Sequence, residues 1–161
     1  MKKKIWDLYA PIYEKAMRAD YKYYKFMYDR IPTKIQNKEV LELATGPGLL
    51  AKHVAYAAKR MVATDYSEGM IREAQKGKCV DNLIFEVADA TDLPYENHSF
   101  DVVLIANALH VMPEPEKALK EIVPVPAAVI DLHRPGEIEG KPILHTGGYP
   151  PPPSGGRVNE F

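Results

Sequence analysis

The sequence predicts an α/β protein in which a doubly wound, mostly parallel sheet carries helices on both faces. Short apolar runs of strand length alternate with segments of helical periodicity, which is the element order that a parallel sheet requires. A glycine-rich turn joins the first of these runs to a helix. Since 161 residues are enough for one compact domain, we expect a single core.

Two helices are expected in the first 35 residues, because tyrosines recur there at helical spacing among charged residues. Pro11 is expected between the two helices or near a helix start, and Pro32 is expected to close the segment. The later elements follow in alternation. We expect strands at 39–44, 61–65, 83–87 and 101–106, helices at 49–59, 68–76 and 114–122, and a fifth strand at 127–132.

The composition changes abruptly at Pro124, since 8 of the 14 prolines and 6 of the 10 glycines lie in the last 38 residues. Such a segment cannot pack a core of its own. We therefore divide the chain into an N-terminal helical segment (1–35), an α/β core (36–133) and a Pro/Gly-rich tail (134–161) that we expect to be disordered.

Charge and cysteine content exclude several classes of protein. The formal net charge is -1, from 21 basic and 22 acidic residues, so no overall field attracts nucleic acid or an anionic membrane. Cys79 is the only cysteine, which excludes an internal disulfide and a cysteine-based metal site and favours a reducing compartment. No apolar run approaches the roughly 20 residues that span a bilayer, and the charged start is unlike a signal peptide. We expect a cytoplasmic protein with no membrane span and no bound metal.

The turn after the first strand reads Ala44-Thr45-Gly46-Pro47-Gly48. Its glycines allow the backbone to approach a ligand closely, and the helix that follows presents its N-terminus to an electronegative group. Nicotinamide dinucleotide enzymes use a related three-glycine turn, in which Ala51 would supply the third small residue. Glu42 in the strand and Pro47 between the glycines do not suit a pyrophosphate.

From this turn onward the sequence resembles the class I S-adenosylmethionine-dependent methyltransferases, which have a Rossmann-like fold. Glu42, Gly46 and Gly48 match the first motif of that family, and Ala44 stands where the family most often has another glycine. Asp65 ends the second strand, where the family places the carboxylate that accepts both ribose hydroxyls. A carboxylate suits two vicinal hydroxyls because it offers two acceptor oxygens.

The resemblance implies an adenine site in two later segments. Tyr66 and Met70 lie in the segment after the ribose carboxylate, where Met70 would cover one adenine face or serve as an ordinary core methionine. Asp89 and the Ala90 backbone amide would read the adenine amine and a ring nitrogen. The run from 87 to 103 is the most specific part of the resemblance, which is strong over 39–122 and loose over 6–30.

The acceptor side is less defined. Asn107 follows the fourth strand, where the methionine end of the cofactor and the substrate should meet. His110 is a candidate to orient the substrate or accept its proton, or a hydrogen-bonded structural residue. Tyr13 would reach the carboxylate of the cofactor, with Trp6 and Tyr9 lining a pocket, unless these aromatic residues simply pack on the sheet.

Nucleic-acid acceptors are disfavoured. The polar residue, two prolines and aromatic residue of DNA amino-group methyltransferases are missing after the fourth strand, and Cys79 lies outside the position of a cytosine-methylating nucleophile. We therefore expect a small-molecule acceptor.

The late strands of the family are not recognisable. The lysine-proline-glycine-glycine turn that should precede them is replaced by Val123-Pro124-Val125-Pro126, which indicates a shortened or altered C-terminal part. Three functions stay open. The chain is an active small-molecule methyltransferase, or a cofactor-binding domain that is inactive until self-association or another chain completes it, or a nicotinamide-dependent oxidoreductase. The third is weakest because it leaves Asp89 and the Ser99-Phe100-Asp101 run unexplained.

Overall fold

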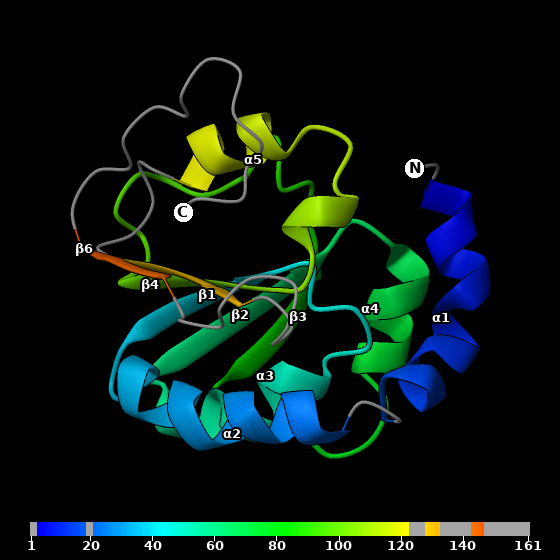
Figure 1. Cartoon of the computed structure of the whole chain (residues 1–161), viewed down its shortest axis with the longest axis horizontal. Coiled ribbons are helices and arrows are strands. Elements are labelled where there is room, and N and C mark those ends of the chain that lie inside the picture. The colour runs from blue at the N-terminus through cyan, green and yellow to red at the C-terminus, as the bar shows by residue number, and fades with distance from the viewer. Residues whose placement is uncertain (1–2, 19–20, 123–127, 133–142, 147–161) are drawn as a thin grey trace.

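The computed structural model describes residues 3–18, 21–122, 128–132 and 143–146, and it has the predicted α/β fold. A twisted sheet forms the centre, with α2 and α3 below it and α5 above it in Figure 1. The N-terminal helices are α1 (Lys3–Arg18) and α2 (Tyr21–Ile35). The remaining elements are β1 (Glu39–Leu43), α3 (Leu49–Val54), η1 (Ala55–Ala57), β2 (Arg60–Asp65), α4 (Glu68–Ala74), β3 (Leu83–Val87), β4 (Val102–Ala106), η2 (Leu109–Val111), α5 (Pro115–Ile122), β5 (Ala128–Leu132) and β6 (Ile143–Thr146).

The sheet has the strand order β3-β2-β1-β4-β5-β6. The first five of these strands in chain order run parallel, and β6 pairs antiparallel with β5. From β1 the chain extends the sheet first toward β2 and β3 and then, on the other side, toward β4. The crossovers therefore change direction between β1 and β4, and in open α/β sheets ligands bind at the carboxyl ends of the strands at such a switch.

Two clusters of buried side chains occupy the two faces of the sheet. One cluster packs α2, α3 and α4 against it and includes Met27, Ile31 and Leu104. The other lies under α5 and η2 and includes Leu41, Ile105 and Ile122. Because consecutive strand residues face opposite sides, β1 and β4 each contribute to both clusters, which explains their nearly continuous apolar sequence.

Both helical prolines correct the sequence prediction, since Pro11 lies inside α1 and Pro32 lies inside α2. A proline inside a helix removes one backbone hydrogen bond and crowds the preceding turn. In α2 this cost is offset by tertiary packing, because Met27, Ile31 and Ile35 are at most 2% exposed against the sheet. Tertiary burial of one helix face contributes more to helix stability than local propensity does.

The C-terminal part adds two strands to the sheet. The predicted fifth strand is found as β5, and β6 lies within 134–161, the range in which regular structure was not expected. The rest of that range lies outside the described residues, so the disordered tail stays a prediction there. Pairing with β5 places β6 in the sheet, and its own composition does not predict that.

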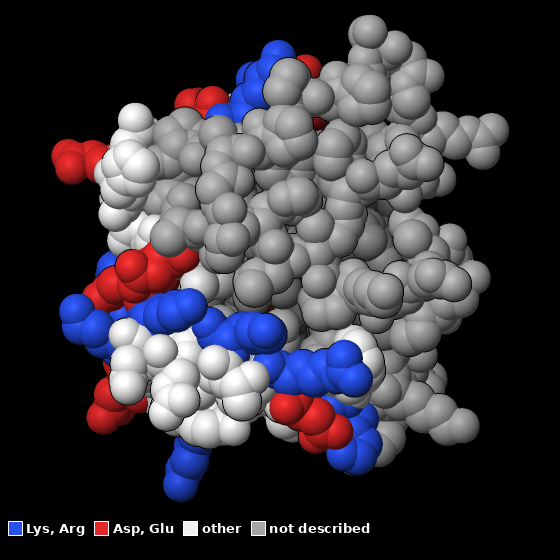
Figure 2. Space-filling view, turned by 60° about the vertical axis from the view of Figure 1, so that its left-hand side comes forward, with Lys and Arg blue, Asp and Glu red and all other residues white. Residues whose placement is uncertain are grey.

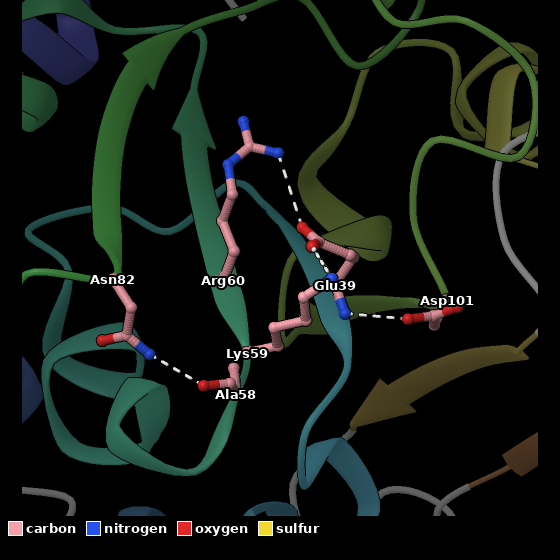
Figure 3. Close-up of polar contacts among 6 residues, drawn as sticks. All are labelled: Glu39, Ala58, Lys59, Arg60, Asn82 and Asp101. Atoms are coloured by element: carbon pink, nitrogen blue, oxygen red, sulfur yellow. Dashed lines mark hydrogen bonds and ion pairs between the residues drawn. The ribbon is translucent and has the colours of Figure 1, made fainter.

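Polar contacts fix the amino ends of the strands, which is the edge of the sheet away from the switch point. The Glu39 backbone N–H donates to Oδ2 of Asp101 at 2.8 Å, and the Glu39 carboxylate pairs with Lys59 at 3.2 Å and Arg60 at 3.6 Å (Figure 3). Asn82 Nδ2 donates to the Ala58 carbonyl at 2.8 Å. Lys59 and Arg60 are solvent-exposed, so these ion pairs contribute little to stability by themselves.

Charges of both signs lie side by side on the surface. In the face shown in Figure 2, lysine and arginine side chains are interspersed with aspartate and glutamate. Ion pairs between described residues, such as Lys25 with Asp29 at 2.7 Å, join some of these neighbouring charges. In the described part of the chain, no helix combines the length and apolar character needed to cross a membrane.

Candidate cofactor-binding site

A cavity of ≈ 300 Å³ opens at the carboxyl ends of β1, β2, β3 and β4, at the switch point of the sheet. It brings together ten of the twelve residues that the sequence predicts for the site, although they are spread over almost a hundred positions of the chain. These are Tyr13, Glu42, Ala44, Gly46, Asp65, Tyr66, Met70, Asp89, Ala90 and Asn107. Parallel strands end at one edge, so residues that follow different strands meet there.

The other two of the twelve predicted residues are Gly48 and His110. Gly48 lies outside the lining, at the N-terminus of α3. Its φ is +77°, and a Cβ at this position would stand 2.7 Å from the Phe85 ring. Gly48 is therefore required for the turn and for close packing on β3. The backbone of His110 lies in η2, and its side chain is outside the described residues.

The turns after β1 and β4 are both left-handed. Ala44, directly after β1, has φ 54°, and Asn107, directly after β4, has φ 51°. A left-handed backbone costs a non-glycine residue about 1 to 2 kcal/mol, and asparagine tolerates it better than alanine does. Both residues line the cavity, so the two central strands each turn sharply at its floor. A glycine would adopt this conformation at position 44 without that cost.

Asp65 is held rigidly at the end of β2. Its Oδ2 accepts the Gly46 N–H at 2.9 Å, and its Oδ1 accepts the Ser67 N–H at 2.9 Å. Burial raises the pKa of Asp65, the two amide hydrogen bonds oppose that rise, and the nearby Asp7 carboxylate adds to it. Each carboxylate oxygen can accept two hydrogen bonds, so one acceptor position on each oxygen is left for a ligand.

Glu42 is the most deeply buried ionisable group at the cavity and is 2% exposed. Its Oε2 accepts the Thr45 hydroxyl at 2.8 Å, and its backbone carbonyl accepts the Thr64 hydroxyl at 3.0 Å. Burial raises the pKa of Glu42 to about 7, the Thr45 hydrogen bond opposes this, and the charge of Asp65 adds to it. A cationic group bound near Glu42 would favour its ionised form.

The two carboxylate oxygens of Asp89 differ in their hydrogen bonds. Oδ1 accepts both the backbone N–H and the hydroxyl of Thr91, at 2.8 and 2.7 Å. Both acceptor positions of Oδ1 are thus occupied, whereas Oδ2 accepts no hydrogen bond from the described residues. Ala90, beside it in the lining, likewise donates its N–H to none of them. An acceptor and a donor on neighbouring residues match the amine and ring nitrogen of an adenine edge.

Met70 and Tyr66 flank the same part of the cavity from the start of α4. Met70 is 2% exposed and belongs to the core, yet it also reaches the lining. The two interpretations left open for Met70 are therefore compatible. Tyr66 is 48% exposed, so its ring lies at the rim.

The N-terminal helix α1 covers one side of the cavity and packs beside α4 (Figure 1). Trp6 and Tyr13 line the cavity, and their rings meet edge to face with centroids 5.7 Å apart. Cε1 of Tyr13 lies 3.7 Å from the position that a Cβ on Gly46 would take, so this ring stands over the glycine turn. Tyr9 does not line the cavity and is 49% exposed, which corrects its predicted role.

Sequence reasoning missed the apolar side of the cavity. Tyr24 from α2, Val111 at the end of η2, and Met112 and Pro113 after it belong to the lining. They carry no motif, and their membership depends on how α2 and η2 pack. Asp7, discussed below, was also missed, because its partners lie about 60 residues away in the chain.

Comparisons with known proteins agree with this geometry. The family described as "Methyltransferase domain" matches residues 41–126, which is more than half of the chain. A demethylmenaquinone methyltransferase of Clavibacter sepedonicus is 36% identical over 97 residues, covering 60% of this chain and 40% of that protein. A ubiquinone/menaquinone biosynthesis C-methyltransferase of Rickettsia bellii is 38% identical over 96 residues, covering 53% and 38%. The chain thus spans less than half the length of these curated relatives.

The fold has solved counterparts as well. A chain from the complex between the Haloferax volcanii Trm112 methyltransferase activator and a methyltransferase superposes with a TM-score of 0.69 at 24% identity, over 78% of this chain and 57% of that one. At this identity the likeness establishes the fold alone. The family match, the motif residues and the strand order together establish that this chain belongs to the methyltransferase-domain family, the class I S-adenosylmethionine-dependent methyltransferases.

Proposed function

We propose that the cavity binds S-adenosylmethionine and that this chain carries methyl transfer to a small-molecule acceptor of the quinone or quinol class. The acceptor class comes from the names of the relatives, which act on demethylmenaquinone or serve ubiquinone and menaquinone biosynthesis. The single observation that carries the cofactor assignment is the geometry of Asp65. Two backbone amides fix its carboxylate at the switch point and leave one acceptor position on each oxygen, which suits two vicinal ribose hydroxyls.

The remaining contacts fit the other parts of the cofactor. Asp89 Oδ2 and the Ala90 N–H suit the adenine edge, and Met70 and Tyr66 suit its faces. Ala44, Gly46 and Asn107 lie on the central strand ends, where the methionine portion would lie. Glu42 offers a carboxylate to a cationic ligand there, at the deepest part of the lining. Gly48 supports this arrangement by shaping the turn rather than by contact.

When bound, S-adenosylmethionine supplies an electrophilic methyl group, so the protein has to orient the acceptor and exclude water. Trp6 and Tyr24 offer a flat aromatic wall, and Val111 and Met112 an apolar one. These surfaces fit a planar ring better than a charged acceptor. Tyr13 and His110 are our candidates for acceptor contact, Tyr13 from its place over the glycine turn and His110 from its position in η2. A carbon acceptor activated by a neighbouring hydroxyl needs little further acid–base help.

Three further assignments belong to this proposal. Residues 1–35 act as a lid over the core at 36–133. The single cysteine and mixed charges favour a cytoplasmic place. Completion by another chain or by self-association stays an alternative to independent turnover, and an activator complex among the structural neighbours supports it.

Calorimetric titration with S-adenosylhomocysteine and, separately, with NAD tests the cofactor assignment. We expect saturable binding of the first and none of the second, because Pro47 and Glu42 oppose a pyrophosphate. Binding of NAD alone would favour the oxidoreductase alternative. Methyl transfer is then followed with methyl-labelled S-adenosylmethionine and a water-soluble hydroxynaphthoquinol, with amine and thiol acceptors as comparison. Binding without transfer to any of them would favour the inactive-domain alternative.

A further inference from the structure

We propose that Asp7 is a positioning residue that latches the α1 lid to the ribose-binding turn at residues 65–69, and so keeps Trp6 and Tyr13 over the cofactor. This inference rests on the proposed function for the identity of the ligand. The latch itself is a feature of how α1 docks on α4.

The latch consists of two hydrogen bonds to one carboxylate oxygen. Oδ1 of Asp7 accepts the Ser67 hydroxyl at 2.6 Å and the Gly69 backbone N–H at 2.8 Å. Ser67 is fully buried and is also the N-cap of α4, where its oxygen accepts the Met70 N–H at 3.1 Å. A hydroxyl has one hydrogen to donate. Because Asp7 takes that hydrogen, it also orients the Ser67 lone pairs toward the helix.

The latch continues into the ligand site without a break. The backbone N–H of Ser67 donates to Asp65 Oδ1 at 2.9 Å, and Asp65 Oδ2 accepts the Gly46 N–H at 2.9 Å. A hydrogen-bonded path therefore runs from the lid helix through Ser67 to the ribose carboxylate and on to the glycine turn. Asp7 is the only member of this path that α1 provides.

Close packing at Gly69 supports the same assignment independently. A Cβ on Gly69 would stand 2.8 Å from the Cα of Asp7 and 3.1 Å from its carbonyl oxygen. Only glycine lets the α1 backbone approach α4 this closely. Gly69 has no positive φ, so its need for glycine comes from this contact and not from its own conformation. An alanine at 69 would favour the helix by itself but would push α1 away.

Docking determines what the lid presents to the cavity. Trp6 precedes Asp7 directly, and Tyr13 follows it by six residues, which is less than two helical turns, and lies near the glycine turn. The two rings are in edge-to-face contact on the same helix, so the position of α1 determines where both lie. A lid that leaves α4 would withdraw both rings from the cavity, which would open it to water. Asp7 thus acts on the site through the position of these two rings.

Trp6 is the only tryptophan of the chain, so its fluorescence reports on the lid alone. We would measure acrylamide quenching of Trp6 with and without S-adenosylhomocysteine, together with calorimetric binding, in wild type, Asp7→Ala, Asp7→Asn and Gly69→Ala. Asp81→Ala, at an exposed carboxylate, and Arg72→Ala, on the exposed face of α4, are the matched controls. Circular dichroism verifies that each variant is folded.

In Asp7→Ala and Gly69→Ala we expect stronger quenching of Trp6 and about tenfold weaker S-adenosylhomocysteine binding, since hydrogen bonds to a charged acceptor are lost or strained. Asp7→Asn keeps Oδ1 and should restore most of the shielding. Gly69→Ala keeps the helix intact, so stronger quenching there identifies undocking rather than unfolding. Shielding and affinity as in wild type in both variants would overturn the latch. Failure of the wild type to bind S-adenosylhomocysteine would instead refute the proposed function. In that case, the comparison of Trp6 quenching between wild type and the variants without ligand would still test the latch.

Discussion

Replacing Glu42 by glutamine should make the protein more stable at alkaline pH while leaving it almost unchanged at acidic pH. Glu42 is 2% exposed, and its pKa is raised from the usual 4.5 to about 7 mainly by burial. A native carboxyl that holds its proton more tightly than the unfolded chain does lowers stability as the pH rises. The effect is absent below pH 4.5, grows between 4.5 and about 7, and is complete above that.

The magnitude follows from the two pKa values. A rise from 4.5 to about 7 corresponds to about 3 kcal/mol of lost stability when Glu42 is ionised in both states. Glutamine has nearly the same shape and keeps an oxygen for the Thr45 hydroxyl, so the variant avoids burying a charge without leaving a cavity. The difference in stability between variant and wild type should therefore change from near zero at pH 4.5 to about 3 kcal/mol at pH 8.

Urea denaturation of the ligand-free protein at several pH values between 4.5 and 8.5 measures this difference. Subtracting the free energy of unfolding of wild type from that of the variant at each pH cancels most of the contribution of all other titrating groups. The electrostatic coupling between Glu42 and Asp65 is the exception. A Glu42→Gln difference that is independent of pH, or that favours wild type as the pH rises, would refute the reasoning.

Three further predictions concern the turn and the ligand contacts. Asp65→Ala should weaken S-adenosylhomocysteine binding by about 2 kcal/mol in calorimetry, because two hydroxyls lose a charged acceptor, and an unchanged dissociation constant would remove Asp65 from the site. Gly48→Ala should lower the free energy of unfolding by about 2 to 3 kcal/mol, because residue 48 has a left-handed φ of 77° and a Cβ there would lie 2.7 Å from the Phe85 ring. Adding Phe85→Leu should recover part of this loss. A Gly48→Ala variant as stable as wild type would contradict the packing role. Asp89→Ala should reduce the ratio of affinities for S-adenosylhomocysteine and its inosine analogue by about tenfold, whereas Asp92→Ala should leave this ratio unchanged. The same ratio in Asp89→Ala and wild type would place the adenine elsewhere.

The order of the elements and the meeting of ten predicted residues at one cavity were predictable from the sequence, because both depend on local patterns. Strands of apolar residues that alternate with helices fix a parallel sheet, and residues that directly follow such strands meet at its carboxyl edge. Asp65 ends β2, Asp89 comes two residues after β3, and Asn107 directly follows β4. Their place at one cavity therefore follows from the positions of the strand ends, without knowledge of any side-chain contact.

Only the tertiary structure determined the contacts between parts of the chain that are far apart in sequence. The need for glycine at 48 comes partly from Phe85, the latch of Asp7 comes from Ser67 and Gly69, and the place of residues 143–146 in the sheet comes from pairing with β5. The prolines inside α1 and α2 are tolerated in helices whose buried faces pack on other elements. The local sequence does not predict these contacts, because a contact between residues tens of positions apart depends on how whole elements pack. Where packing and local propensity disagree, the free energy of packing outweighs the propensity.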